Sequence, residues 1–319
     1  MIYWITEMPS MGKVLRNHKN CRTEFAWFIS SDGTVLNYGD LLDNTYAETD
    51  VIIFIIPKRE DYVRNIVSDK FREIVSKIPA KIGIMQEGPS TYWLDYPLDI
   101  QIQFYNFCSN LDFILSHNEI DAKFYRGFFP NVPVYVNHSL MIEDTITDVN
   151  WQPEDKTIIG GNFVNWYGGF QSYSISSEFG CPVSAPSMGR MDKREQELDI
   201  NHLPYMQWDE WIYSLSKFKY AIHLMPTVAA GTFSLNCGYF GIPCIGNVKI
   251  DTQRLLYPDL SIDVNDLHLA RALAIRLKSD SIFYADVSQK AYELYRSVFS
   301  ESNWLRNWNE ILTNIKKDV

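Results

Sequence analysis

One short run limits the folds open to this chain more than any other feature. Residues 51–56, VIIFII, are six consecutive apolar residues, and Pro57 follows them. Strands covered by helices on both faces show uninterrupted apolar runs, whereas half-exposed strands alternate apolar and polar residues. The run is also far shorter than the ~20 residues that cross a bilayer. It therefore predicts a buried strand of a parallel sheet.

Strand-like and helix-like patterns alternate along most of the chain, as they do in α/β proteins built on parallel sheets. The segment 141–155 is polar and has no clear period. We place a domain boundary in it and predict two Rossmann-like lobes, residues 1–145 and 146–319, with the terminal helices in the second range. The expected strands are residues 1–9, 50–57, 80–86, 112–117 and 132–139 in the first lobe and 156–163, 181–186, 201–206, 219–226, 243–247 and 260–264 in the second.

Charge and cysteine content narrow the class of protein. The net charge of −10 argues against a globally basic surface for nucleic acid, although it leaves local basic segments open. The five cysteines form no Cys-x-x-Cys pair, and no Asp-x-Asp follows a strand. The first residues, MIYWITEMPS, lack the basic stretch and cleavage site of a secretory signal. We therefore expect a cytoplasmic protein with no membrane span, no disulfide and no metal site.

The stretch PTVAAGTFSLNCGYFGIPCIGN, residues 226–247, carries the strongest candidate for ligand binding. Its pattern indicates the end of a strand, a turn of small residues, a helix that opens at Thr232 and a second strand. Backbone N–H groups at the start of a helix, together with its dipole, bind phosphate groups. We predict diphosphate contacts at Gly231, Thr232, Phe233 and Ser234, and a ribose contact at Asn236. The alternative is an ordinary turn whose helix is capped by Thr or Ser.

Two further strand ends in the second lobe offer groups for an anion. Gly160, Gly161 and Asn162 follow an apolar strand and can present backbone N–H groups, or they can serve backbone geometry alone. The loop SMGRMDKR follows the next strand, and its basic side chains could hold a diphosphate or remain solvated. Among its basic residues we predict contacts from Arg190 and Lys193.

The order of these elements resembles the GT-B fold of nucleotide-sugar-dependent glycosyltransferases. The resemblance covers LDFILSHNEIDAKFYRGFFPNVPVYVNHS, QWDEWIYSLSKFKYAIHLMP and YFGIPCIGN. It implies two lobes facing a cleft, the C-terminal lobe holding the donor and the last helix crossing back to the first lobe. Retaining members usually carry two glutamates eight positions apart in the donor loop. The matching positions here are Val228 and Asn236, which argues against the standard retaining mechanism.

A fainter resemblance links the chain to the T-even phage DNA glucosyltransferases. GGNF followed by NWYGGFQ is similar to the entry of their donor lobe, where arginines follow the glycines; here none do. Glu87, just past the strand KIGIM, matches the position of their strand-end aspartate base. This resemblance implies that Glu87 takes the acceptor proton. A structural glutamate that accepts hydrogen bonds from loop amides is the alternative.

Other candidate residues in the first lobe belong to the acceptor side. Gly12 and Lys13 lie in the loop after the first strand, where GT-B enzymes admit the acceptor. Tyr92 and Trp93 follow Glu87 and could stack on a sugar ring or a nucleobase, or pack within the lobe.

These observations favour a metal-independent glycosyltransferase. It would move a sugar from a nucleoside-diphosphate sugar, UDP-linked, to a hydroxyl acceptor, either a glycan or a hydroxymethylated DNA base. The donor is a co-substrate, and no further cofactor is expected. A nucleotide-sugar epimerase of the same fold and a non-catalytic binding protein are the alternatives.

Overall fold

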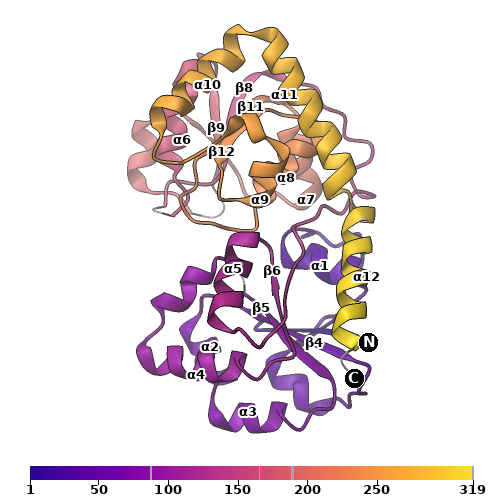
Figure 1. Cartoon of the computed structure of the whole chain (residues 1–319). Coiled ribbons are helices and arrows are strands. Elements are labelled where there is room, and N and C mark those ends of the chain that lie inside the picture. Colours follow the sequence, from indigo (N-terminus) through magenta and orange to yellow (C-terminus); the bar gives the residue numbers. More distant parts are fainter. Residues whose placement is uncertain (87, 165, 188–189, 318–319) are drawn as a thin grey trace. The chain divides into compact units, whose positions relative to one another are not determined.

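The chain divides into two compact units. The structure, a computed structural model, describes residues 1–86, 88–164, 166–187 and 190–317 (Figure 1). One unit comprises Met1–His18, Glu24–His138 and Trp304–Val319, and the other comprises Lys19–Thr23 and Ser139–Asn303. Most of the last helix thus groups with the first unit, whereas the predicted domain ranges place the terminal helices in the second lobe. The sequence analysis placed the division near residue 145, and in the structure it follows His138.

The first unit is built on a seven-stranded sheet with the order β2-β3-β1-β4-β5-β6-β7. All its pairs are parallel except β2 with β3. The run VIIFII forms β4, and all six of its residues are buried, which confirms the first prediction. The sequence analysis missed β2 and β3, which are short. The strands are β1 (Ile2–Thr6), β2 (Gly12–Lys13), β3 (Thr34–Asn37), β4 (Val51–Ile56), β5 (Lys81–Gln86), β6 (Phe113–Ser116) and β7 (Val134–Val136).

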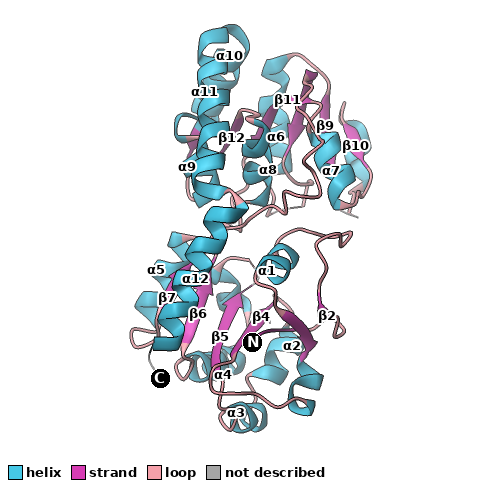
Figure 2. Cartoon of the chain, turned by 90° about the vertical axis from the view of Figure 1, so that its right-hand side faces the viewer, coloured by secondary structure: helices cyan, strands magenta, loops and turns pink. Residues whose placement is uncertain are grey.

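Helices pack against both faces of this sheet (Figure 2). On one face, the Phe54 ring of β4 packs edge-on against Phe71 and Phe107. The pattern of residues 59–78 predicts one helix, but the structure has two, because the Ser68 hydroxyl accepts a hydrogen bond from the Phe71 N–H and caps a new helix. The helices are α1 (Glu24–Ser30), α2 (Glu60–Ile66), α3 (Asp69–Val75), α4 (Leu98–Cys108), α5 (Glu119–Phe128) and α12 (Glu301–Lys317).

Tryptophans join the last helix to the first strand on the other face. Trp4 of β1 stacks on Trp308 of α12 at 5.9 Å and meets Trp27 of α1 edge-on. Trp308 also stacks on Trp304 at 5.5 Å. Each large ring removes roughly 150–250 Å² of surface from water, so this cluster holds α12 on the first unit.

The second unit has a six-stranded, wholly parallel sheet with the order β10-β9-β8-β11-β12-β13. Chain order runs outward from β8 to β10 in one direction and from β11 to β13 in the other. Two parallel sheets with covering helices confirm the predicted α/β fold. The strands are β8 (Glu154–Ile159), β9 (Val183–Pro186), β10 (Asn201–Leu203), β11 (Phe218–His223), β12 (Cys244–Asn247) and β13 (Ser261–Ile262). The helices are α6 (Gly169–Ser176), α7 (Trp208–Leu215), α8 (Thr232–Phe240), α9 (Asp251–Leu256), α10 (Leu267–Ser279) and α11 (Ser281–Leu294).

Helix length and polarity also bear on membrane association. Among the residues that the structure describes, no helix combines the length and the apolar character needed to span a bilayer.

Candidate functional site

The candidate site lies where the strand order of the second sheet reverses, between β8 and β11. These two strands are parallel neighbours, with Ile159 opposite Ile222, so the loops that follow them leave the same edge. In open α/β sheets, ligands bind at the carboxyl ends of the strands at this switch point. The two loops are residues 160–168 and 224–231, and both were singled out, in part, by the sequence analysis.

The start of α8 depends on Gly231. This residue is left-handed, with φ 73° and ψ 25°, and none of the described side chains caps the helix. A Cβ atom here would lie 1.9 Å from Thr252 Oγ1 and 2.7 Å from Ile250 Cγ2. Glycine is therefore required both by the backbone angle and by the space. The first N–H groups of a helix lack intrahelical acceptors, so Thr232, Phe233 and Ser234 can turn theirs toward an anion.

The Ser234 hydroxyl belongs to a brace beneath this turn. It donates to the Gly231 carbonyl at 3.1 Å and lies 2.8 Å from Thr252 Oγ1, which also bonds that carbonyl at 2.8 Å. Ser234 is only 1% exposed. Its side chain therefore holds the turn, and its backbone N–H is the group that remains for a ligand.

The loop that leads into α8 is fixed at three further points. The Leu224 N–H donates to Ser172 Oγ at 2.9 Å, Asn247 Nδ2 donates to the Met225 carbonyl at 2.8 Å, and Ser139 Oγ donates to the Ala230 carbonyl at 2.8 Å. The partners Ser172, Asn247 and Ser139 come from three separate segments of the second unit. The loop is thus held in one conformation before any ligand binds, which lowers the entropic cost of binding.

Phe233 and Asn236 pack inward from α8. The Phe233 ring meets the His223 ring at 5.0 Å, and a Cβ atom at Gly160 would lie 2.6 Å from His223 and 2.7 Å from Phe233. The Asn236 amide, oriented to satisfy its neighbours, accepts from Trp211 Nε1 at 2.9 Å and donates to the Thr232 carbonyl at 3.0 Å. Asn236 is 5% exposed. Its amide is therefore engaged within the unit, where the sequence analysis expected it to reach a ribose.

A second helix start lies beside the first. Gly168 precedes α6 in the left-handed region, with φ 63°, and no described side chain caps that helix either. A Cβ atom at Gly168 would lie 2.0 Å from the Leu224 carbonyl oxygen, and one at Gly169 would lie 2.3 Å from the Asn162 carbonyl oxygen. Because neither glycine has a side chain, the start of α6 can lie in close contact with the loop after β8 and with the loop after β11. The sequence analysis did not single them out, although the Gly-Gly pair was a usable signal.

Gly160, Gly161 and Asn162 connect β8 to this second helix. The Gly160 N–H donates to the Ile222 carbonyl at 2.7 Å, and Gly161 has φ 90°. Asn162 is 1% exposed; its Nδ2 donates to the Ser187 carbonyl at 3.3 Å and its Oδ1 accepts from the Val164 N–H at 3.2 Å. The segment therefore ties the loop after β8 to the loop after β9.

Arg190 is the cation that the structure places against this loop. Its Cζ lies 5.9 Å from the centre of the Trp166 ring, and both side chains are exposed. Lys193 is exposed too and begins a short turn capped by Asp192. Arg194 forms two hydrogen bonds to the Glu197 carboxylate, of 3.0 and 2.9 Å. Arg190 therefore lies beside the loop after β8, and its neighbour Trp166 was not among the predicted site residues.

The predicted residues of the first unit are more dispersed. Lys13 pairs with Asp32 at 2.5 Å, and Gly12, with φ 65°, precedes it in β2. Tyr92 is half-buried beneath the Lys58 ammonium, 4.5 Å from its ring centre. Trp93 is 7% exposed and packs on Phe128 at 4.4 Å, which favours the packing alternative. Glu87 lies outside the described residues.

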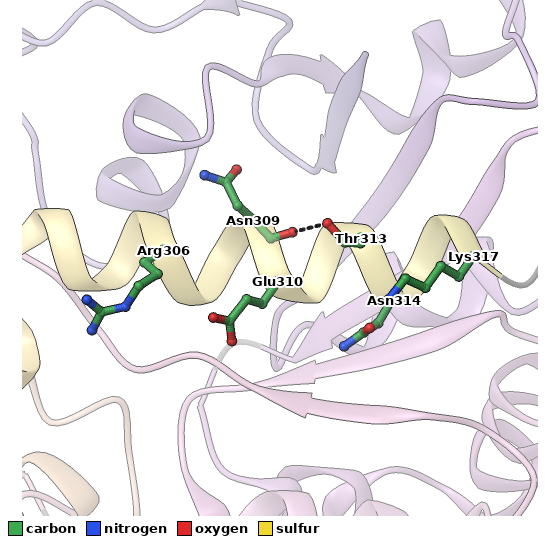
Figure 3. Close-up of a pocket in the computed structure, with 6 residues that line it drawn as sticks. All are labelled: Arg306, Asn309, Glu310, Thr313, Asn314 and Lys317. Carbon is green, nitrogen blue, oxygen red and sulfur yellow. Dashed lines mark hydrogen bonds between the residues drawn. The ribbon is translucent and has the colours of Figure 1, made fainter.

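A hollow also runs along the exposed side of α12, and Figure 3 shows its lining. The six residues come from this one helix and mix amides with charges of both signs. None of them is a predicted site residue. They are Arg306, Asn309, Glu310, Thr313, Asn314 and Lys317. Within the described ranges, no three His, Cys, Asp or Glu side chains gather in a way that could hold a metal ion.

Burial of two histidines predicts acid lability. Desolvation lowers the pKa of His223 to about 4, and desolvation with a contribution from His138 lowers the pKa of His117 to about 4. The unfolded chain, with a His pKa near 6.5, then binds more protons than the folded one as pH falls from about 6.5 to about 4. Each histidine should cost up to about 3 kcal/mol of stability across that window. Urea unfolding at pH 7.5 and 4.5 measures the loss. His223→Gln should make the dependence of stability on pH less steep, and an unchanged dependence in this variant would contradict the prediction.

The comparisons with known proteins concern the fold. No protein-family model and no curated protein sequence matches the chain. Solved structures do match it. An alpha-glucosyltransferase in complex with UDP and a 13-mer DNA containing an HMU base is 14% identical with a TM-score of 0.59, and the match covers 98% of this chain and 99% of that one.

Other matched structures are larger. A Staphylococcus aureus TarM mutant in complex with Fondaparinux, alpha-GlcNAc-glycerol and UDP is 9% identical with a TM-score of 0.64, over 86% of this chain and 57% of that one. The pneumococcal O-GlcNAc transferase GtfA, with UDP and GlcNAc, is 10% identical with a TM-score of 0.58, over 90% and 60%. The chain therefore has the fold of GT-B glycosyltransferases, including one whose structure was solved in complex with DNA, and the predicted resemblance is confirmed at the level of fold.

Proposed function

We propose that the chain is a glycosyltransferase that moves a sugar from a UDP-linked donor to a hydroxyl acceptor without a metal ion or further cofactor. The observation that carries this proposal is the pair of helix starts at the switch point of the second sheet. α6 and α8 each begin at a left-handed glycine with no described side chain as a cap. Their N–H groups suit a diphosphate, and the matched structures with UDP support that choice.

The proposed chemistry is a displacement at the anomeric carbon of the sugar. The bond from that carbon to the diphosphate oxygen breaks, and a bond to the acceptor oxygen forms. Glu87 takes the proton of the acceptor hydroxyl, and the departing UDP keeps the electron pair of the broken bond. Helix N–H groups at Thr232 and Phe233, with the Arg190 guanidinium, stabilise the charge that develops on the diphosphate. The acceptor is a glycan or a hydroxymethylated DNA base.

Thermal unfolding against nucleoside diphosphates and nucleotide sugars tests the proposal. A ligand that binds the folded chain alone must raise the melting temperature. We expect a selective shift for a UDP-sugar that EDTA leaves unchanged. No shift with any nucleotide would contradict the proposal and favour a binding protein without this chemistry. Conversion of the sugar nucleotide in the absence of an acceptor would identify an epimerase instead.

Arg190→Ala should weaken UDP binding by about 10–100-fold, because a hydrogen bond to a charged group contributes about 1.5–3 kcal/mol. The matched control is Arg194→Ala in the same loop, whose guanidinium is 82% exposed and bonded to Glu197. The control should leave UDP affinity within about twofold of the unchanged protein, as expected for an exposed pair. Equal affinities for both variants, measured by calorimetry, would remove Arg190 from the donor site.

A further inference from the structure

The segment between β1 and α1 has a charge opposite to that of the protein. Residues 8–23 contain no Asp or Glu, in a chain whose net charge is −10. They carry four cations, each three residues after the last: Lys13, Arg16, Lys19 and Arg22. We call residues 12–22 the basic loop. A local positive segment on an acidic protein directs a polyanion to one place and repels it elsewhere.

The basic loop runs from β2 to α1 (Figure 2), and the residues at its tip are exposed. A turn closes where the His18 N–H donates to the Leu15 carbonyl at 3.0 Å, and Leu15 is 69% exposed. Arg16 and Lys19 are exposed at and beside this tip. Lys13 pairs with Asp32, but both side chains are more than half exposed, so phosphate can replace that carboxylate at little cost.

The far end of the loop is fixed within the second unit. Arg22 donates to the carbonyls of Met206 and Gln207 at 2.6 and 3.0 Å, and the Trp208 N–H donates to the Lys19 carbonyl at 3.1 Å. Burial lowers the pKa of Arg22. Arg22 therefore anchors the loop, whereas Lys13, Arg16 and Lys19 are exposed.

Aromatic rings are interleaved with these cations. The His18 ring stacks on Phe25 at 4.9 Å with 9° between the planes. The Arg22 guanidinium lies 5.8 Å from the centre of the Tyr205 ring, and Tyr205 is 61% exposed. Basic side chains for the backbone and rings for unpaired or flipped-out bases are a combination by which proteins hold nucleic acid. A neutral glycan could use the rings but would gain nothing from the cations, so the positive charge favours a polyanion.

We infer that the basic loop binds the phosphate backbone of a nucleic acid, with Lys13, Arg16 and Lys19 as its contacts, and that the acceptor is therefore a base of that nucleic acid. This inference rests on the proposed function. It extends that function by deciding between the two acceptor classes and by locating the docking surface in the first 22 residues.

The test is the binding of a labelled 20-base-pair DNA duplex to the full chain between 50 and 300 mM salt. Each phosphate contact contributes about 0.9 to the slope of log affinity against log salt. Lys13→Gln/Arg16→Gln/Lys19→Gln should bind at least tenfold more weakly at low salt and lower that slope by about 2–3. The matched control removes three exposed lysines of the first unit, Lys70→Gln/Lys77→Gln/Lys123→Gln, and should keep the slope.

Two further binding measurements distinguish a failure of the proposed function from a failure of this inference. UDP-sugar binding should be unchanged in the triple variant, so a chain that binds no UDP-sugar contradicts the proposed function, whereas one that binds it but not DNA contradicts only this inference. The second measurement is the binding of a heparin oligosaccharide to the same variants. Loss of heparin binding with DNA binding retained, or equal loss of DNA binding in the control variant, would overturn the inference. Circular dichroism of both variants checks that the fold is intact.

Discussion

Replacing Gly231 by alanine is expected to abolish UDP-sugar binding and to lower the free energy of unfolding by about 2–5 kcal/mol. A left-handed backbone costs a residue with a Cβ atom roughly 1–2 kcal/mol, and forcing extra volume into a packed site costs roughly 1–3 kcal/mol more. Here the new atom would meet Thr252 Oγ1 at 1.9 Å, within the brace that holds the start of α8. Relief of that clash must move the helix N–H groups away from the diphosphate.

The control for Gly231→Ala separates backbone strain from the clash. Gly12 is also left-handed, with φ 65°, but no atom lies within 4 Å of a Cβ placed there. Gly12→Ala should therefore cost only the roughly 1–2 kcal/mol of the backbone and leave UDP binding unchanged. Urea unfolding and calorimetric titration with UDP give both quantities. If the two variants had the same free energy of unfolding and the same UDP affinity, the space around Gly231 would not be what positions the loop before α8.

A double variant keeps this prediction testable even where Gly231→Ala folds poorly. Thr252→Ala removes the nearest atom, so Gly231→Ala/Thr252→Ala should be less destabilised than the sum of its single changes. Neighbouring residues commonly show coupling energies of about 0.5–3 kcal/mol. Additive effects would contradict the assignment of Thr252 as the obstacle.

Local signals explain what the sequence could predict. The six apolar residues of β4 and the turn before Thr232 are defined by residues within a few positions of each other, and the structure has both where they were expected. Glycine, proline and the period of apolar residues act over such distances. The chain order of strands and helices then suffices to indicate the two-lobe fold.

Contacts between distant segments explain what the sequence could not predict. The sequence predicts a ligand contact at Ser234 but not the contact of its hydroxyl with Thr252, eighteen residues further on, which arises because α9 returns beneath the turn. Asn236 is held by Trp211 of the preceding helix. The order of the strands in the sheet decides which of these distant side chains meet, and no short sequence pattern predicts that order. Small polar residues at a helix start can serve the ligand or the turn, and only the packed structure distinguishes the two.

Glu87→Gln is expected to lower kcat by about 10²–10⁴-fold while leaving UDP binding unchanged, since a positioned general base contributes a factor of that size. The residue follows β5 directly, and its flanks are fixed: Gln86 is 3% exposed, and the Ser90 N–H donates to Asp121 Oδ1 at 2.8 Å. Asp121 thus takes the structural role of bonding a loop amide. The resemblance assigns proton transfer to Glu87.

A control variant and the pH profile of activity test the assignment of Glu87 as the general base. Glu119→Gln removes an exposed carboxylate that pairs with Arg126 on α5, and it should leave kcat within about twofold, as expected for an exposed ion pair. With Glu87 as the base, activity should fall on the acid side as its carboxylate is protonated, and Glu87→Gln should lose that limb of the profile. Full activity of Glu87→Gln with the acid limb retained would place the base elsewhere. Lost UDP binding in that variant would instead mean that Glu87 holds the loop and does not act on the acceptor.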